Sequence, residues 1–177
     1  MDDAALIARV LGGDREGFDV LVERYHEGCR RYAAHMLGNW DDAEDAVQET
    51  FLRAYRSLGR YRERDRFRAW LYRILVNRCR TLASQRARRD GRFVSDERAM
   101  DEAAADGETT SPWLAPLLAA LGRLPALQRE ALLLKHGEGL DYQEIAEVTG
   151  VSVSALKMRV KRALDTLRPW MRDTNHG

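Results

Sequence analysis

The chain has 177 residues, of which 45% are hydrophobic and 32% are charged, and its formal net charge is +1 at pH 7. This length suits one domain or two small ones, and no apolar run approaches the roughly 20 residues that a membrane-spanning helix needs. The acidic start, MDDAALIARV, lacks the basic segment and apolar core of a secretory signal. We therefore expect a soluble cytoplasmic protein without membrane insertion, in which Cys29 and Cys79 are reduced, buried thiols.

Charge is segregated along the chain. Residues 53–92 include fourteen arginines and only three acidic residues. Residues 95–110 reverse the sign, with six acidic residues and one arginine, and residues 157–172 are basic again. Segregation on this scale indicates a polyanionic partner at the basic parts, with solvated helix faces as the alternative for the first basic run.

Apolar residues recur at spacings of three and four along residues 1–90, which predicts amphipathic helices. No stretch alternates with a period of two for long enough to form a strand. The glycine pair at 12–13 and the Gly-Asn pair at 38–39 mark helix ends. Asp41 or Asp42 is expected to cap the next helix, whose early acidic residues suit its positive N-terminal end.

This periodicity fails in the middle of the chain. Residues 91–111 are polar, acidic and rich in Gly, Ser, Thr and Ala, so we expect a flexible linker with a short helical turn near 97–104. The predicted fold is all-α, with two small helical domains, 1–90 and 112–177, joined by this acidic linker. Each domain has a modest core, and binding of a partner can add to its stability.

The second domain contains a pattern typical of a helix-turn-helix. Asp141 and Glu144 form a capping-box pattern at the start of one helix. Gly150 allows a tight turn, because a left-handed backbone costs glycine little, and Ser152 or Ser154 can cap the helix that follows. The inner face of that second helix is predicted to be Leu156, Val160, Ala163, Leu164 and Leu167.

Long cations dominate the outward face of the second helix. Such cations reach base edges or phosphates when the helix enters the major groove of DNA. An ordinary helical hairpin would leave the glycine turn, the small Ala146 and this basic face as coincidences. The outward residues are Lys157, Met158, Arg159, Lys161 and Arg162.

The basic run of the first domain also contains aromatic residues, a combination typical of proteins that bind single-stranded nucleic acid. Core packing is the favoured interpretation for Phe67, Trp70 and Tyr72. Tyr61 differs, because it lies among charges in LGRYRERDR and is expected to be exposed. The polar residues near the start of the following helix and on its other face are Arg66, Arg68, Arg73, Asn77 and Arg80.

Three segments together resemble a known family. They are DDAEDAVQETFLRAY, FRAWLYRILVNRCRTL and LDYQEIAEVTGVSVSALKMRVKRALDTL, in this order along the chain. They resemble a bacterial RNA polymerase sigma factor of the extracytoplasmic-function group, and the resemblance covers nearly all of both domains. The resemblance implies a transcription initiation factor that is not an enzyme and needs no cofactor or metal.

The resemblance implies two partners for the first domain. Its acidic helix would dock on the clamp helices of the largest subunit of core RNA polymerase, through Asp45, Gln48, Glu49, Leu52 and Tyr55. The basic part that follows would melt the −10 promoter element and hold a flipped base in a pocket shaped by Tyr61 and Asn77. The residues implied for the −10 element are Tyr61, Arg62, Arg66, Arg68, Arg73, Asn77 and Arg80.

The resemblance assigns the −35 element to the second domain. The implied reading residues are Ser154, Lys157, Met158, Arg159, Lys161 and Arg162. Members of the family commonly have Gly-Thr and Ser where this chain has Ser154-Ala155 and Met158, so two hydroxyls are lost. By similarity, the acidic linker runs through the polymerase cleft, and an anti-sigma factor is the expected regulatory partner.

Two other classes of function stay open on the residues alone. A metal or redox site is conceivable at His26, Cys29 and His35, although no carboxylate cluster completes a metal sphere. A two-domain activator or repressor, acting without polymerase docking, would need the helix-turn-helix. It would leave the acidic helix and the arginine-aromatic helix without a role.

Overall fold

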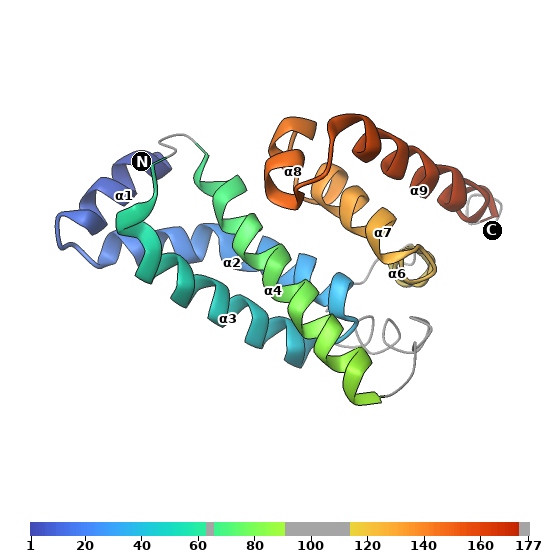
Figure 1. The fold of residues 1–177 in the computed structure, drawn as a ribbon, viewed down its shortest axis with the longest axis horizontal. Coiled ribbons are helices and arrows are strands. Elements are labelled where there is room, and N and C mark those ends of the chain that lie inside the picture. Colours follow the sequence, from blue (N-terminus) through green and yellow to red (C-terminus); the bar gives the residue numbers. More distant parts are fainter. Residues whose placement is uncertain (63–65, 91–113, 174–177) are drawn as a thin grey trace.

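The computed structural model describes residues 1–62, 66–90 and 114–173, and every regular element in these ranges is a helix (Figure 1). The all-α prediction is confirmed, whereas the predicted linker 91–111 and its helical turn lie outside the described residues. The first group of helices comprises α1 (Asp3–Leu11), α2 (Glu16–Leu37), α3 (Trp40–Ser57), a 3-10 turn η1 (Leu58–Arg60) and α4 (Phe67–Asp90). The second group comprises α6 (Leu114–Gly122), α7 (Ala126–Leu132), a π-helical turn η2 (Leu133–Gly137), α8 (Tyr142–Thr149) and α9 (Val153–Asp173).

The junction between α2 and α3 shows how local sequence sets the helix ends. Gly38 adopts a left-handed conformation, with φ 79°, and its N–H donates to the carbonyl of Ala34. Asn39 then caps α3, because its side-chain oxygen accepts a hydrogen bond from the Asp42 N–H at 2.7 Å. The expectation that Asp41 or Asp42 is the cap was wrong, since the tight glycine turn lets the helix begin at Trp40, at least two residues earlier than either aspartate would allow.

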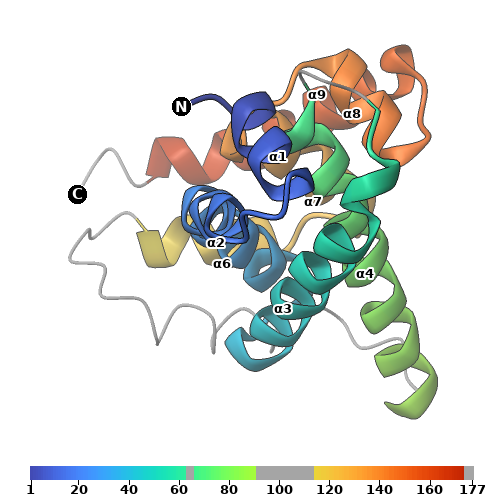
Figure 2. The same cartoon turned by 90° about the vertical axis from the view of Figure 1, so that its left-hand side faces the viewer.

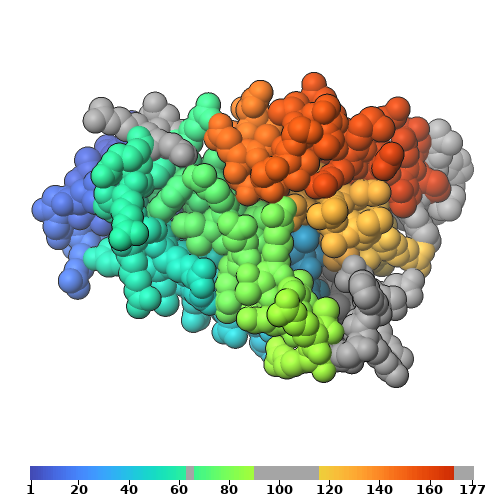
Figure 3. All heavy atoms as spheres, viewed as in Figure 1, coloured from blue at the N-terminus to red at the C-terminus, as the bar shows by residue number. Residues whose placement is uncertain are grey.

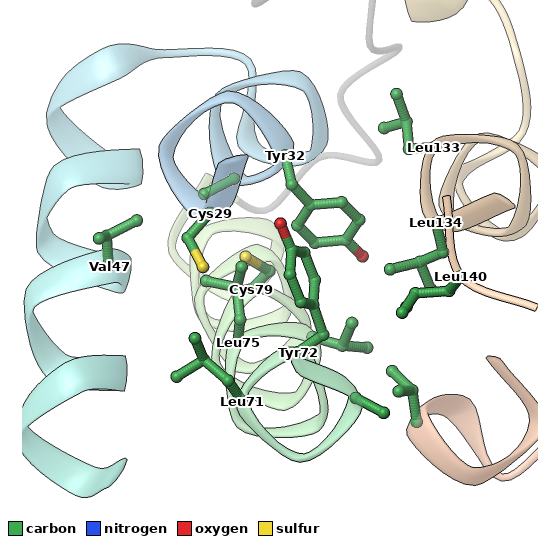
Figure 4. Close-up of a cluster of buried hydrophobic side chains, with 14 of the residues drawn as sticks. Cys29, Tyr32, Val47, Leu71, Tyr72, Leu75, Cys79, Leu133, Leu134 and Leu140 are labelled. Carbon is green, nitrogen blue, oxygen red and sulfur yellow. The ribbon is translucent and has the colours of Figure 1, made fainter. Parts of the chain in front are cut away.

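Helices α2, α3 and α4 lie side by side and enclose the core of the first group (Figure 2). Cys29 of α2 and Cys79 of α4 meet Val47 of α3 and Leu75 of α4 in this core (Figure 4). Both thiols are free and buried, as predicted. Burial raises the pKa of the Cys79 thiol to about 12 and raises that of Cys29 further, so both stay protonated at neutral pH.

The apolar core continues from the first group into the second. Tyr32 projects from α2 toward Leu134 and Leu140, and the ring of Tyr72 from α4 packs edge-on against Tyr32, with 5.9 Å between ring centroids (Figure 4). All four side chains are almost fully buried. In the space-filling view, the surface of α4 meets that of the second group directly (Figure 3). The sequence predicted a separate, modest core for each domain. In the structure, buried apolar side chains of both groups of helices form one continuous core, and α4 contacts α8.

The helix-turn-helix forms as predicted. Asp141 and Glu144 make both hydrogen bonds of a capping box, each at 2.8 Å. Gly150 is left-handed, with φ 73°, and the hydroxyl of Ser152 accepts a hydrogen bond from the Ala155 N–H at the start of α9. The predicted inner face is buried except for Leu164, which is 36% exposed because it lies at the edge of the apolar stripe.

Candidate functional site

The acidic surface lies on α3. Asp45 and Gln48 are exposed on the side of the helix away from the core, as the apolar periodicity predicted. Glu49 is half-buried instead, because it pairs with Arg53 one turn later and with Arg78 of α4 at 2.7 Å. Asp45 and Gln48 therefore offer more accessible polar groups to a partner than Glu49 does.

An apolar groove adjoins this acidic surface. It lies between α2 and α3, has a volume of about 590 Å³, and includes Gln48 and Leu52 in its lining. Leu52 is 54% exposed and Tyr55 is 40% exposed, so the two side chains extend the apolar surface of the groove. The ring of Tyr55 packs edge-on against Phe18, with 5.0 Å between ring centroids. A charged rim around an apolar groove suits docking of a helical partner.

Tyr61 is buried, so the expectation of an exposed ring was wrong. Its ring centroid lies 5.1 Å from that of Trp70 and 6.0 Å from that of Phe67, and only 8% of the residue is exposed. Its hydroxyl accepts a hydrogen bond from the Arg66 N–H at 3.1 Å. The turn η1 ends in an extended residue at Tyr61, which directs the ring beneath the start of α4. The prediction failed because the charged neighbours of Tyr61 in the sequence indicated an exposed loop, whereas its ring packs against residues of α4.

The other residues predicted for the −10 element divide into two sets. Asn77 is exposed and Arg73 is half-buried on α4, while Arg62 is exposed beyond η1 and donates to the Gly59 carbonyl at 2.8 Å. The remaining three cations, one just before α4 and two on it, all meet the second group of helices, which sequence reasoning did not foresee. They are Arg66, which pairs with Glu147; Arg68, which lies 3.8 Å from Glu144; and Arg80, which pairs with Glu130.

Glu130 is the residue that sequence reasoning missed most clearly. Both of its carboxylate oxygens accept hydrogen bonds from the Arg80 guanidinium, at 2.6 and 2.9 Å, and only 2% of Glu130 is exposed. This pairing raises the pKa of Arg80. The segment ALQREALLL places this glutamate in a strongly apolar helix, and a carboxylate that becomes buried there needs a hydrogen-bonded cation.

The basic face of α9 remains open in this structure. Lys157, Met158, Lys161 and Arg162 are exposed, and Ser154 is exposed near the helix start. Arg159 differs, because it is half-buried and its Nη1 has no hydrogen-bond partner among the described residues. Four of these exposed side chains, those of Ser154, Lys157, Lys161 and Arg162, present the hydrogen-bonding and charged groups that reading of a DNA major groove requires.

The residues of the conceivable metal site do not converge. Cys29 points into the core, while His26 lies 3.4 Å from Glu44 at the surface, so the two do not share a usable face. Burial and the nearby cations lower the pKa of His35 to about 4. In the described ranges, no group of three or more His, Cys, Asp or Glu residues could hold a metal ion.

Comparison with known proteins identifies the family. Models of sigma-70 region 2 and sigma-70 region 4 match residues 21–89 and 114–167. The RNA polymerase sigma-H factor of Pseudomonas aeruginosa is 31% identical, over 97% of this chain and 96% of that protein. The ECF RNA polymerase sigma-E factor of Haemophilus influenzae is 30% identical, over 94% of each. The chain belongs to the extracytoplasmic-function sigma factors.

The fold of this sigma factor agrees with that assignment. It is similar to the sigma factor RpoE, solved in complex with the anti-sigma factor NepR from Bartonella quintana, with a TM-score of 0.76 and 28% identity. The match covers 88% of this chain and 96% of that chain. The region 2 match includes α3 and α4, and the region 4 match includes the helix-turn-helix. Across the described ranges, no helix is both long and apolar enough to cross a membrane.

Proposed function

We propose that this sigma factor binds core RNA polymerase through α3 and directs initiation by reading two promoter elements. The −35 element is read as duplex by α9, and the −10 element is melted and held by α4 and the residues before it. One observation carries this proposal: an exposed acidic and apolar surface on α3 lies beside the arginine-rich helix α4. Opposite charges on adjacent helices suit two partners, a basic protein surface and a nucleic acid.

Docking on polymerase is assigned to Asp45 and Gln48, with Leu52 and Tyr55 supplying apolar contacts beside the groove. We propose the clamp helices of the largest subunit as the partner, because a groove with a charged rim accepts helices. Glu49 has a positioning role instead, since its ion pairs with Arg53 and Arg78 tie α3 to α4. An anti-sigma factor is a further proposed partner, by analogy with the RpoE complex.

The −10 element is assigned to the polar residues of α4 and the loop before it, namely Arg62, Arg66, Arg68, Arg73, Asn77 and Arg80. Cations along one helix can contact successive phosphates, and the amide of Asn77 can donate to and accept from a base edge. Tyr61 is assigned a supporting role, because its buried ring and hydroxyl hold the start of α4. Three of the six residues contact the second domain, so holding the strand requires that domain to move.

Transcription in vitro tests the proposal directly. The purified chain, added to core RNA polymerase with a randomised promoter library, should yield specific transcripts that are absent without the chain. The chain without polymerase should show little promoter preference, since its own DNA binding depends on phosphate contacts. If the chain alone binds DNA tightly and sequence-specifically and yields no polymerase-dependent transcripts, the chain is instead an activator or repressor that acts without polymerase docking.

Asn77→Ala should reduce promoter opening while leaving closed-complex formation nearly unchanged. Loss of its hydrogen bonds to the extruded strand is expected to cost about 1–2 kcal/mol, or about five- to thirtyfold in the population of open complex. Permanganate footprinting of unpaired thymines measures this population. A pre-melted bubble should restore only part of it, because the strand must still be held. Equal footprints from duplex promoters with both holoenzymes would remove Asn77 from the site.

Lys161→Ala should weaken duplex binding by the full chain and make it less sensitive to salt. Loss of one phosphate contact should reduce the magnitude of the slope of log affinity against log salt by about 0.9. Met158→Ala on the same exposed face is the matched control, since it removes contact area without changing charge. Fluorescence anisotropy at several salt concentrations gives both slopes. If the two variants keep the parent slope, Lys161 does not contact phosphate.

A further inference from the structure

Four glutamates of the second domain form one acidic surface against the first domain. We call them the glutamate face: Glu130, Glu138, Glu144 and Glu147. Each of them lies against a cation of α2, of α4 or of the residue just before α4, and three of those cations are proposed contacts of the −10 strand. Carboxylates thus occupy the positions where the proposed function requires phosphates. Figure 1 shows α8, which carries two of these glutamates, beside α4.

The deepest of these contacts is the pair between Glu130 and Arg80. Their two hydrogen bonds form a fork against the guanidinium, the geometry in which arginine binds a carboxylate or a phosphate most strongly. Arg80 Nη1 also lies 3.4 Å from the Thr149 carbonyl. Because Glu130 is almost fully buried, closure removes its carboxylate from water, and the two hydrogen bonds from Arg80 offset the cost of that desolvation. The pair therefore specifies one closed arrangement of the two domains.

Glu138 forms a second contact at the centre of the interface. It accepts a hydrogen bond from the Tyr72 hydroxyl at 2.5 Å and lies 3.4 Å from Arg31. Its side chain is 8% exposed, and burial raises the pKa of Tyr72, which keeps that phenol as a proton donor. The carboxylate thus has a donor and a cation within reach, although it lies in a turn at the surface of its own domain.

Gly28 of α2 explains how Glu138 approaches so closely. A Cβ atom at this position would lie 2.9 Å from the Tyr72 hydroxyl and 3.0 Å from Glu138 Oε2. Glycine in the middle of a 22-residue helix lowers the stability of the helix, so its presence needs a local reason. The reason on this face of α2 is space for the hydrogen-bonded pair of the Tyr72 hydroxyl and Glu138, the second of which comes from the other domain.

We propose that the glutamate face mimics DNA phosphates and competes with the promoter strand for the arginines of α4. The free chain is then closed, and its second domain must leave α4 before the −10 strand can be held. The basic face of α9 stays exposed in the closed arrangement, so closure blocks the single-strand surface and spares the duplex-reading surface. This inference rests on the proposed function, because it uses the assignment of α4 to the −10 strand.

Apolar contacts add to the acidic ones. Tyr32, Tyr72, Leu134 and Leu140 belong to one buried apolar cluster across the two groups of helices, and salt does not screen such contacts. The exposed pair of Arg66 and Glu147 contributes less, since surface ion pairs are weak. Added salt alone should therefore leave the chain closed, whereas a steric wedge or a charge reversal within the interface should open it.

Gly28→Ala supplies the wedge without removing a charge, and alanine favours helix α2. Dyes attached through Arg56→Cys and Asp165→Cys, at exposed positions of the two domains, report opening by resonance energy transfer. The native cysteines are buried and should label slowly. Anisotropy of a fluorescein-labelled 12-mer of single-stranded oligothymidylate reports access to α4. Gly137→Ala is the control, because its Cβ would lie 3.9 Å from its nearest neighbour, an ordinary contact.

In Gly28→Ala, transfer efficiency should fall and affinity for the oligonucleotide should rise by about fivefold or more, while duplex affinity changes by less than about twofold. Glu147→Arg, on the exposed edge of α8, is a second variant that leaves the core intact and should shift both readouts in the same direction. Circular dichroism checks that each variant is folded.

Unchanged transfer efficiency in both folded variants would overturn the closed state. Lower transfer efficiency with unchanged oligonucleotide affinity would overturn the phosphate mimicry. Both of these results are distinct from the result that would contradict the proposed function. That result is a lack of polymerase-dependent transcripts with the parent chain. The proposal about closure can therefore fail while the assignment of promoter-specific initiation stands.

Discussion

Asp45→Arg combined with Gln48→Ala is expected to lower the affinity of this sigma factor for core RNA polymerase by about thirty- to several-hundredfold. Both side chains are exposed on α3, next to the apolar groove that includes Leu52. Charge reversal adds repulsion as well as removing attraction, and such changes at interfaces typically cost about 2–4 kcal/mol. Interferometry with immobilised core polymerase measures the loss.

The stability of the variant should match that of the parent, because neither residue contributes to the apolar core. Glu23→Arg is the matched control: it reverses one exposed acidic residue on α2, outside the lining of the groove. If the control binds core polymerase normally while the double variant binds weakly, the docking surface is α3. Parent-like binding of the double variant would place the polymerase contact elsewhere on the chain.

Tyr61→Ala is expected to destabilise the first domain by about 3–4 kcal/mol, since it removes a large ring packed against Phe67 and Trp70. Tyr61→Phe keeps the ring and loses only the hydrogen bond from the Arg66 N–H, so it should cost about 1 kcal/mol. Urea unfolding followed by circular dichroism measures both changes in the free energy of unfolding.

The same pair of variants separates a structural role from base stacking. If Tyr61 supports the start of α4, then Tyr61→Phe opens promoters like the parent and Tyr61→Ala loses activity together with stability. If the ring is free to stack on a base, Tyr61→Ala remains as stable as the parent and fails only at promoter opening. That second outcome would contradict the packing in the structure and restore the interpretation drawn from the sequence.

Helix identity and helix ends were predictable because their causes are local. Gly38 and Gly150 adopt the left-handed turns that glycine permits, and the capping box of Asp141 depends on a residue three positions away. The exposure of Asp45 and Lys157 followed from the apolar periodicity of their own helices. Even here a local choice between neighbours failed, since Asn39 caps α3 in place of Asp41 or Asp42.

The sequence by itself determined the family, the all-helical fold and the helices that carry the opposite charges, because motif order, periodicity and charge lie within single segments. Only the tertiary structure decided that Tyr61 is buried, that Glu49 is held by Arg78, and that Glu130 covers Arg80. These contacts join residues from different helices, so no periodicity within one helix predicts them. Whether a side chain is buried depends on which residues of another helix pack against it. For that reason Arg66, Arg68 and Arg80 looked free in the sequence but meet glutamates in the fold.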